Sequence, residues 1–217
     1  MQVVETSYDG QTPLVNNFRR YPVAIGLIAI CVVVFLLFYQ LRVVSLLSLL
    51  NFVPFEVTLA GTRFAEPGDW WRFVTPIFLH FGWTHLVFNS LWVWEFGRRI
   101  EGRLGGVNFL GLVLVSAVAS NIAQYMVTGP SVFGGMSGVV YALLGFIWAG
   151  NWVHPRWLEP LPPALLGFML VWLLVGLTGA LSFLGLGAIA NGAHFGGLLA
   201  GVICGAGIGL ATRWAKQ

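Results

Sequence analysis

Long stretches without a charged residue dominate the chain. Residues 21–41 and 73–94 form two such stretches, of 21 and 22 residues. Either length matches one α-helix across roughly 30 Å of hydrocarbon. Residues 104–155 and 160–212 form two longer stretches, of 52 and 53 residues, and each fits two helices with a connecting turn. The pattern therefore predicts six membrane-spanning helices.

Turn-forming residues divide both longer stretches, at Thr128 to Ser131 and at the glycine-rich segment Ser182 to Gly187. We place the spans at about 22–41, 81–97, 106–127, 134–152, 163–181 and 188–211. They form a membrane domain at 21–212, between a short cytoplasmic N-terminal segment at 1–20 and a cytoplasmic tail at 213–217.

The segment between the first two spans, residues 42–72, mixes apolar with charged residues and has Trp70 and Trp71 near its end. No part of it is long and apolar enough to cross a bilayer, and tryptophan is enriched at the membrane interface. The predicted fold class is an all-α membrane protein: a six-transmembrane-helix bundle with a long interfacial loop between helices 1 and 2.

Composition supports a membrane protein, because 58% of the residues are hydrophobic and only 9% are charged. A soluble domain carries roughly 25% charged residues. The net charge of +3 comes without a dense basic cluster, which argues against nucleic-acid binding. Cys31 and Cys204 lie in apolar runs and are expected to be buried thiols, without a disulfide or a metal.

Lysine and arginine are unevenly divided between the two sides of this topology. One side receives eight: Arg19, Arg20, Arg98, Arg99, Arg103, Arg156, Arg213 and Lys216. The other side receives three: Arg42, Arg63 and Arg72. Cytoplasmic loops are enriched in these residues, so both termini are predicted to lie in the cytoplasm.

Polar residues within the spans are few, and they share one depth. The second span carries His85 and Asn89, the fourth carries Ser137, and the sixth carries Asn191 and His194. These three spans run in the same direction, and each polar group lies a few residues below the outer surface. Such residues are costly in a membrane, which makes them candidates for function.

Small residues predict which of these spans meet. His194, Gly197 and Gly201 lie on one face of the sixth span, and the fourth span has a stripe of small residues from Gly138 to Ala149. Small residues let membrane helices approach closely. If the two stripes meet, Ser137 and His194 come within reach of each other.

A serine beside a histidine forms a nucleophile and base pair. Ser137 follows glycines at the start of a helix, where unpaired backbone N–H groups can bind an oxyanion. His85 and Asn89 are four residues apart on one helix face and could supply further donors. No acidic residue lies near this depth, so a Ser137–His194 dyad is favoured over a triad.

Each of these signals also has a simpler explanation in helix packing, and only their combination favours chemistry. A metal site made of His80, His85 and His194 is the weaker alternative, because no carboxylate or thiolate accompanies them. We assign no role to His80 or His154 from their spacing.

Three blocks of residues follow one another in order on the second, fourth and sixth spans. They are Trp71-Arg72 with His85-x-x-x-Asn89, the segment Gly135 to Leu143, and the segment Asn191 to Gly197 with Gly201. In these blocks, from about residue 70 to 205, the chain resembles the rhomboid intramembrane serine proteases, most closely the bacterial six-helix type. Glu101 and Arg103 also fit the segment that follows the second helix of that family.

The resemblance implies a role for each matching residue. Ser137 would be the nucleophile and His194 the general base, while the backbone N–H of Ser137, with His85 and Asn89, would form the oxyanion hole. Tyr141 would pack against the His194 ring. Supporting positions would be Tyr141, Gly135, Gly138, Gly197 and Gly201.

The resemblance also implies the setting of the reaction. Substrates would be transmembrane segments of other proteins, cut near the outer face, in a bacterial inner membrane and without a cofactor. The loop before the second span would lie in the outer leaflet, and the fifth span and Ser182 to Gly187 would act as gate and cap. About twenty residues precede the first span, so we expect no soluble cytoplasmic domain.

Two alternatives from other classes stay open at this point. A non-catalytic rhomboid-like protein would bind or escort membrane clients, but such proteins tend to lack the serine or the histidine. A transporter or channel would use the polar cluster as a hydrated pathway, but the spans carry no carboxylate at that depth.

Overall fold

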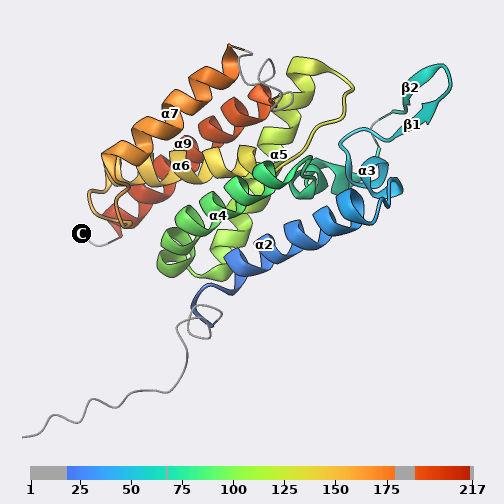
Figure 1. Ribbon diagram of the computed structural model, residues 1–217. Coiled ribbons are helices and arrows are strands. Elements are labelled where there is room, and N and C mark those ends of the chain that lie inside the picture. The colour runs from blue at the N-terminus through green and yellow to red at the C-terminus, as the bar shows by residue number, and fades with distance from the viewer. Residues whose placement is uncertain (1–18, 67, 179–188, 216–217) are drawn as a thin grey trace, which may run out of the picture.

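The computed structural model of the chain describes residues 19–66, 68–178 and 189–215. Within them, six helices of at least 14 residues lie side by side as a bundle (Figure 1). They are α2 (Pro22–Phe35), α4 (Trp83–Leu104), α5 (Gly106–Thr128), α6 (Ser137–Val153), α7 (Pro163–Leu177) and α9 (Asn191–Trp214). The predicted fold class, an all-α bundle with a long loop between the first two helices, is confirmed.

Among the described residues, three helices are long and apolar enough to cross a membrane: α5, α9, and α2 with its π-helical continuation η1 (Leu36–Gln40). The helices α6 and α7 are apolar but have only 17 and 15 residues, and α4 is charged in its second half. How far each helix lies within the bilayer stays a prediction. The expected segment 1–20 and the end of the tail fall largely outside the described residues, as does the loop Ser182 to Gly187.

The helix α6 lies at the centre of the bundle, and twelve of its 17 residues are buried. Its closest neighbour is α9. A side-chain carbon added at Gly197 would overlap the carbonyl group of Gly138, and one added at Gly201 would overlap that of Ala142. The two stripes of small residues therefore meet, as the sequence predicts, and the two backbones lie in direct contact.

The last turn of α4 holds the beginning of α2. Glu101 is buried, and its two carboxylate oxygens accept hydrogen bonds from the backbone N–H groups of Val23 and Ala24, at 2.9 and 2.8 Å. These N–H groups have no partner within their own helix. The sequence places Glu101 and Arg103 after the second helix, but α4 continues to Leu104 and includes both.

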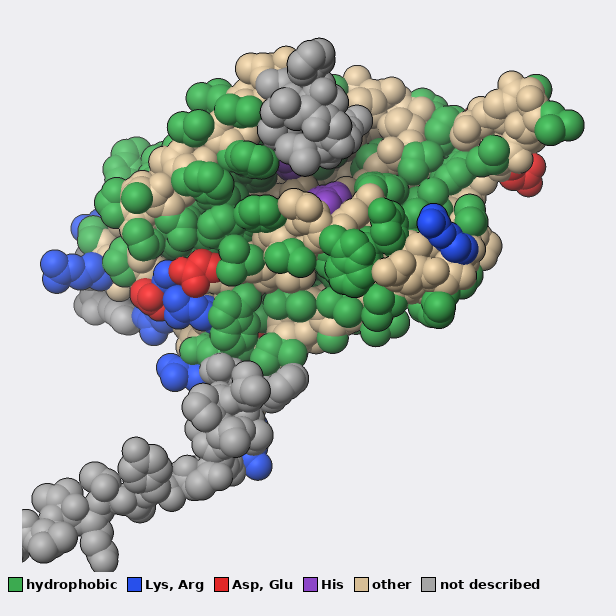
Figure 2. All heavy atoms as spheres, in the orientation of Figure 1, with side chains coloured by type: hydrophobic (Ala, Val, Ile, Leu, Met, Phe, Trp, Pro, Cys, Tyr) green, Lys and Arg blue, Asp and Glu red, His purple; other side chains and the backbone are tan. Residues whose placement is uncertain are grey.

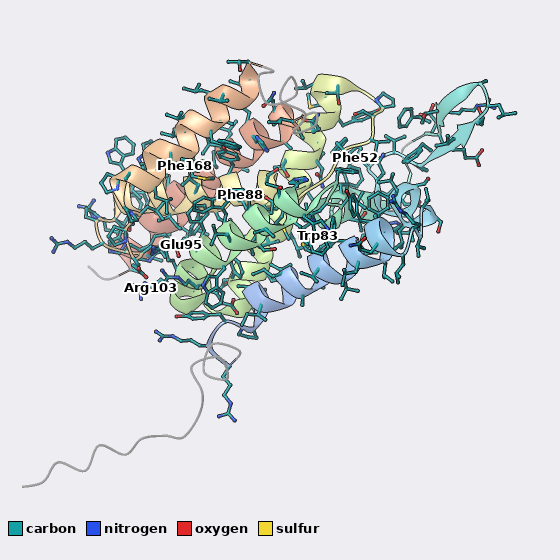
Figure 3. All side chains as sticks on the ribbon, in the orientation of Figure 1. Phe52, Trp83, Phe88, Glu95, Arg103 and Phe168 are labelled. Carbon is teal, nitrogen blue, oxygen red and sulfur yellow. The ribbon has the colours of Figure 1, made fainter. Side chains whose placement is uncertain are left out.

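Charged side chains gather at this end of the bundle (Figure 2), and Figure 3 shows Glu95 and Arg103 there. Arg98 and Arg99 each pair with Glu95 on their own helix and with Glu159 between α6 and α7. Arg103 donates to the carbonyl of Trp157. Ion pairs thus connect α4 to the segment that leads into α7. The pairing of residues three and four apart on α4 also supports a helix that extends beyond the expected span.

The segment between α2 and α4 is a folded loop. It contains α3 (Ser45–Leu50), the antiparallel strands β1 (Phe55–Thr58) and β2 (Gly61–Phe64), and the short helices η2 (Trp70–Phe73) and η3 (Thr75–Phe78). The sequence signals no strands here. Each strand has only four residues, and the turn at Leu59-Ala60 lacks the Asn-Gly or Asp-Gly pair that marks a hairpin.

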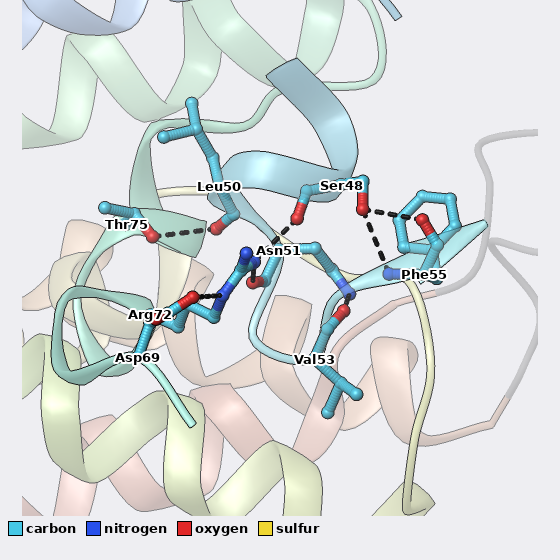
Figure 4. A network of polar contacts seen from close by, with 8 residues as sticks. All are labelled: Ser48, Leu50, Asn51, Val53, Phe55, Asp69, Arg72 and Thr75. Atoms are coloured by element: carbon cyan, nitrogen blue, oxygen red, sulfur yellow. Dashed lines mark hydrogen bonds and ion pairs between the residues drawn. The ribbon is translucent and has the colours of Figure 1, made fainter. Parts of the chain in front are cut away.

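Arg72 fastens this loop internally (Figure 4). Its guanidinium group donates to the carbonyls of Ser48 and Asn51, at 2.6 and 2.9 Å, and pairs with Asp69 at 2.9 Å. Thr75 donates to the Leu50 carbonyl. An arginine can satisfy several acceptors at once because its planar group carries five N–H bonds. The buried charge is therefore paired, and α3 is held against η2.

Asn51 extends this network to the segment before α6. Its amide nitrogen donates to the carbonyls of Val53 and Ser131, at 2.8 and 3.0 Å, and its amide oxygen accepts from the backbone N–H of Phe133 at 3.1 Å. The folded loop thereby holds in place the segment of chain that leads to Ser137.

Replacement of Gly201 by alanine should loosen the contact between α6 and α9. The added carbon overlaps a backbone carbonyl that cannot move alone, so we expect the free energy of unfolding to fall by about 1–3 kcal/mol. Thermal unfolding in detergent measures this. The matched control is Gly207→Ala on the same helix, where an added carbon meets nothing within 4 Å. Equal stability of the two variants would contradict the backbone contact.

Candidate active site

Ser137 and His194 are in hydrogen-bond contact. Ser137 is the first residue of α6, and His194 lies in the first turn of α9. The distance between Ser137 Oγ and His194 Nε2 is 2.8 Å. The contact lies one turn from the meeting of Gly138 with Gly197, where the two backbones touch. The predicted proximity of the two residues is confirmed, and helix packing is its cause.

The other ring nitrogen of His194 has no hydrogen-bond partner among the described residues, although it is buried. The ring instead packs on Tyr141, with 4.8 Å between centroids and 41° between planes. The hydroxyl of Tyr141 donates to the Met169 carbonyl of α7 at 3.0 Å. Within the described part of the chain, an aromatic contact therefore orients the imidazole in the place of a carboxylate.

The chain just before Ser137 lies against α4. Gly135 has a φ of +117°, in the left-handed region that favours glycine, and its N–H donates to the Pro76 carbonyl at 3.0 Å. A side-chain carbon at Gly135 would overlap the His85 ring and would lie 3.6 Å from Asn89 Nδ2. Both polar side chains of α4 thus converge on the backbone beside the serine.

Asn89 is 5% exposed, and its Nδ2 atom has no hydrogen-bond partner among the described residues. A buried donor without a partner is unusual and calls for an explanation. It lies one helical turn from His85 on the same face of α4. Ser137, His194, His85 and Asn89 are thus gathered in one place, with the unpaired donor Asn89 Nδ2 near Gly135, two residues before the serine.

Two polar residues of α5 that were not predicted from the sequence also support this region. Gln124 accepts a hydrogen bond from the backbone N–H of Ala193 at 3.1 Å, next to His194. Asn121 donates to the Phe73 carbonyl of η2 at 2.9 Å. Both lie near the end of the third expected span, 106–127, so the criterion of shared depth that singled out the other polar residues could have found them.

Asn191 makes its hydrogen bond to α7 and not to the serine or the histidine. Its amide nitrogen donates to the Gly176 carbonyl of α7 at 3.1 Å, so it connects the start of α9 to α7. In residues 19–66, 68–178 and 189–215, no group of three or more histidine, cysteine or acidic side chains is arranged to hold a metal. Cys31 and Cys204 are free thiols; Cys31 is buried as expected, whereas Cys204 is partly exposed, so the expectation of burial is wrong for it.

His80 is fully buried beside this group. Its ring centroid is 4.9 Å from that of His85, and its Nδ1 atom is 3.2 Å from the Phe78 carbonyl oxygen. Burial, with a smaller contribution from the nearby His85, lowers the pKa of His80 to about 3. The ring is therefore neutral at neutral pH. Figure 2 shows histidine atoms on the face of the molecule, between hydrophobic side chains, and His85 is partly exposed.

Comparison with known proteins places the whole arrangement in a family. A family model described as the rhomboid domain matches residues 67–210. The rhomboid protease GlpG of Yersinia pseudotuberculosis serotype I (strain IP32953) is 43% identical over 133 residues, which cover 61% of this chain and 46% of that protein. The rhomboid protease GlpG homolog of Cronobacter sakazakii (strain ATCC BAA-894) is 34% identical over 195 residues, which cover 89% of this chain and 64% of that protein.

The chain thus spans about half the length of the first of these relatives. The family match begins in the folded loop before α4 and ends within α9. It therefore includes the helices that carry Ser137, His194, His85 and Asn89. On this match the chain belongs to the rhomboid family.

Proposed function

We propose that the protein is an intramembrane serine endopeptidase, which hydrolyses transmembrane segments of other proteins with Ser137 as nucleophile and His194 as general base. The observation that carries the proposal is the 2.8 Å contact between Ser137 Oγ and His194 Nε2. It occurs in a rhomboid-family chain whose relatives are named proteases. A hydroxyl bonded to an unprotonated imidazole nitrogen is prepared to lose its proton.

The first half of the reaction forms an acyl-enzyme. His194 Nε2 takes the proton of the Ser137 hydroxyl while Oγ attacks the scissile carbonyl carbon, and the carbonyl oxygen becomes an oxyanion. The tetrahedral intermediate collapses as Nε2 returns that proton to the leaving amide nitrogen. The peptide bond breaks, and the new N-terminus departs.

The oxyanion is the species that the surrounding donors would stabilise. The backbone N–H of Ser137 lies at the start of α6, where it has no partner within the helix. Asn89 Nδ2 is a buried donor without a partner among the described residues, and His85 lies beside it. Donors held in place before the reaction need no rearrangement when charge develops, which is why they accelerate it.

The second half of the reaction restores the enzyme. A water molecule from the outer side attacks the acyl carbon while His194 takes one of its protons. The intermediate then releases Ser137 Oγ, which recovers the proton, and the product leaves as a carboxylate. The aromatic support from Tyr141 keeps the imidazole in place through both halves.

Substrate access would occur past α7. Only Met169, Leu173 and Gly176 of this helix are buried. Its hydrogen bonds to the site region come from Tyr141 and Asn191. A substrate helix must unwind locally, because its hydrogen bonds otherwise hide the scissile carbonyl. In this proposal α7 is the gate; the proposed cap, Ser182 to Gly187, lies outside the described residues.

The protein is an integral membrane protein, and its relatives from Yersinia and Cronobacter are bacterial. We place both termini in the cytoplasm, since the charged end of the bundle carries most of the arginines. The serine and histidine then lie toward the outer face, and the loop with β1 and β2 lies in the outer leaflet. Helical spans favour an inner bacterial membrane. The proposed chemistry needs no cofactor.

Replacement of Ser137 by alanine should abolish cleavage of a fluorescent transmembrane substrate by the purified protein in detergent. It removes the atom that attacks the carbonyl. Wild type that cleaves no faster than Ser137→Ala would overturn the proposal and favour a client-binding or transport role.

As an independent measure, a fluorophosphonate should label Ser137 in the wild type but not in His194→Ala, which has lost the base. Normal labelling of that variant would exclude His194 from the proposed role.

Replacement of Asn89 by alanine should lower kcat by about 10²–10³ and leave KM nearly unchanged, because the lost donor acts mainly on the oxyanion. Steady-state kinetics with the same substrate measure both constants. The matched control on the same helix is Leu91→Ala, whose side chain is exposed to the surroundings of the bundle. A fall in kcat of the same size in both variants would mean that α4 is merely disturbed.

The rate should fall as the pH is lowered. His194 must be unprotonated to accept the proton of Ser137, and uptake of one proton removes that ability. Log(kcat/KM) should therefore decline toward acid with a slope of one. The fluorophosphonate labelling rate should follow the same curve, since it depends on the same base. A profile that stays flat until the protein unfolds would contradict a histidine base.

A further inference from the structure

A narrow void lies behind Asn89, on the side of α4 that faces α2. Its lining includes His80, Asn89, Ser90 and Met136. It comprises about 160 Å³ that no protein atom fills and is partly open to the surroundings, yet it is nowhere wide enough for a water molecule. A polar atom that faces it therefore finds no water partner there.

Two atoms in this wall are complementary. His80 Nε2 and Asn89 Nδ2 are both buried without a hydrogen-bond partner among the described residues. The Phe78 carbonyl oxygen near His80 Nδ1 can only accept, so Nδ1 carries the proton and Nε2 carries a lone pair. Asn89 Nδ2 carries two hydrogens. One atom is an acceptor and the other a donor. Their residues line the same void, although no hydrogen bond joins the two atoms in this structure.

The acceptor atom, His80 Nε2, favours one of the two orientations of the Asn89 carboxamide. A carboxamide has a donor end and an acceptor end of similar shape, so it can present either one in the same space. The lone pair of His80 attracts Nδ2 and repels Oδ1. Nδ2 is also the atom near Gly135, beside Ser137. If Oδ1 took its place, it would repel an oxyanion there.

We propose that His80 is a positioning residue, whose Nε2 lone pair selects the orientation of Asn89 that presents Nδ2 to the reacting carbonyl oxygen. The inference rests on the proposed hydrolysis and adds to it a residue that makes no contact with substrate. Because burial lowers the pKa of His80, its ring is neutral at neutral pH, and Nε2 is then an acceptor.

Two amide variants of His80 separate its nitrogens. In His80→Asn, the amide reaches the position of Nδ1 but leaves the position of Nε2 empty. In His80→Gln, the amide oxygen reaches the position of Nε2 and can serve as the acceptor. We expect His80→Asn to lower kcat by roughly tenfold with KM within about twofold of wild type, and His80→Gln to keep kcat within about threefold.

A double-mutant cycle identifies Asn89 as the partner. If His80 acts through Asn89, His80→Asn has no further effect on kcat in the Asn89→Ala background. Ser90→Ala is the control. Ser90 lines the same void, and its hydroxyl is a second donor from which Nε2 could accept a hydrogen bond in place of the Asn89 amide. We expect Ser90→Ala to leave kcat unchanged. Thermal unfolding in detergent shows that the variants compared are folded, and His80→Leu replaces His80→Asn if the latter does not fold.

The outcomes are distinct. Three results would each overturn the role of His80 and leave the proposed hydrolysis standing. The first is an equal kcat for His80→Asn and His80→Gln, and the second is additive losses of kcat in the cycle. The third is a loss of kcat in Ser90→Ala equal to that in His80→Asn. If the wild type cleaves no faster than Ser137→Ala, the hydrolysis itself fails, and the positioning role fails with it.

Discussion

Direct contact between the backbones of α6 and α9 determines where the polar groups of this protein meet. In a bilayer, helices gain little from hydrophobic burial against one another, so close packing and hydrogen bonds hold them together. Gly197 and Gly201 bring α9 against the carbonyls of Gly138 and Ala142. This contact leaves little freedom for α9 to rotate or slide. The Ser137–His194 pair lies at one end of this contact, so the 2.8 Å distance between the two residues follows from the packing of the two helices.

The remaining side of the site is held by a folded loop and by α4. Arg72 closes the loop on itself, and Asn51 ties it to the chain that leads into α6. Gly135 then lies against His85, so the backbone before Ser137 is fixed from two directions. Such bracing suits a site whose donors must stand in place before charge develops. By contrast, few residues of α7 are buried, and its polar bonds come from Tyr141 and Asn191.

Much of this arrangement could be predicted, because it depends on patterns within single helices. The uncharged stretches indicate the helices, and the spacing of His85 and Asn89 places them on one face. The hairpin of β1 and β2 could not be predicted, because short strands without a marked turn carry little local signal. The extension of α4 through Glu101 was also missed, since its charges are satisfied by ion pairs and by the start of α2. Those partners are distant in the sequence.

The sequence by itself determined where the helices lie along the chain, which of them carry the polar residues, and the lack of a carboxylate near those residues. These are properties of residue type and of position along the chain. Only the tertiary structure decided which polar residues meet. Asn191 and His194 lie on the same helix, yet Asn191 bonds to α7 and His194 to Ser137. His80 and Asn89 line the same void, which is too narrow for water, only because α2, α4 and the residue before α6 come together there. The physical reason is that contacts between helices depend on their rotation and separation, which no spacing along one helix contains.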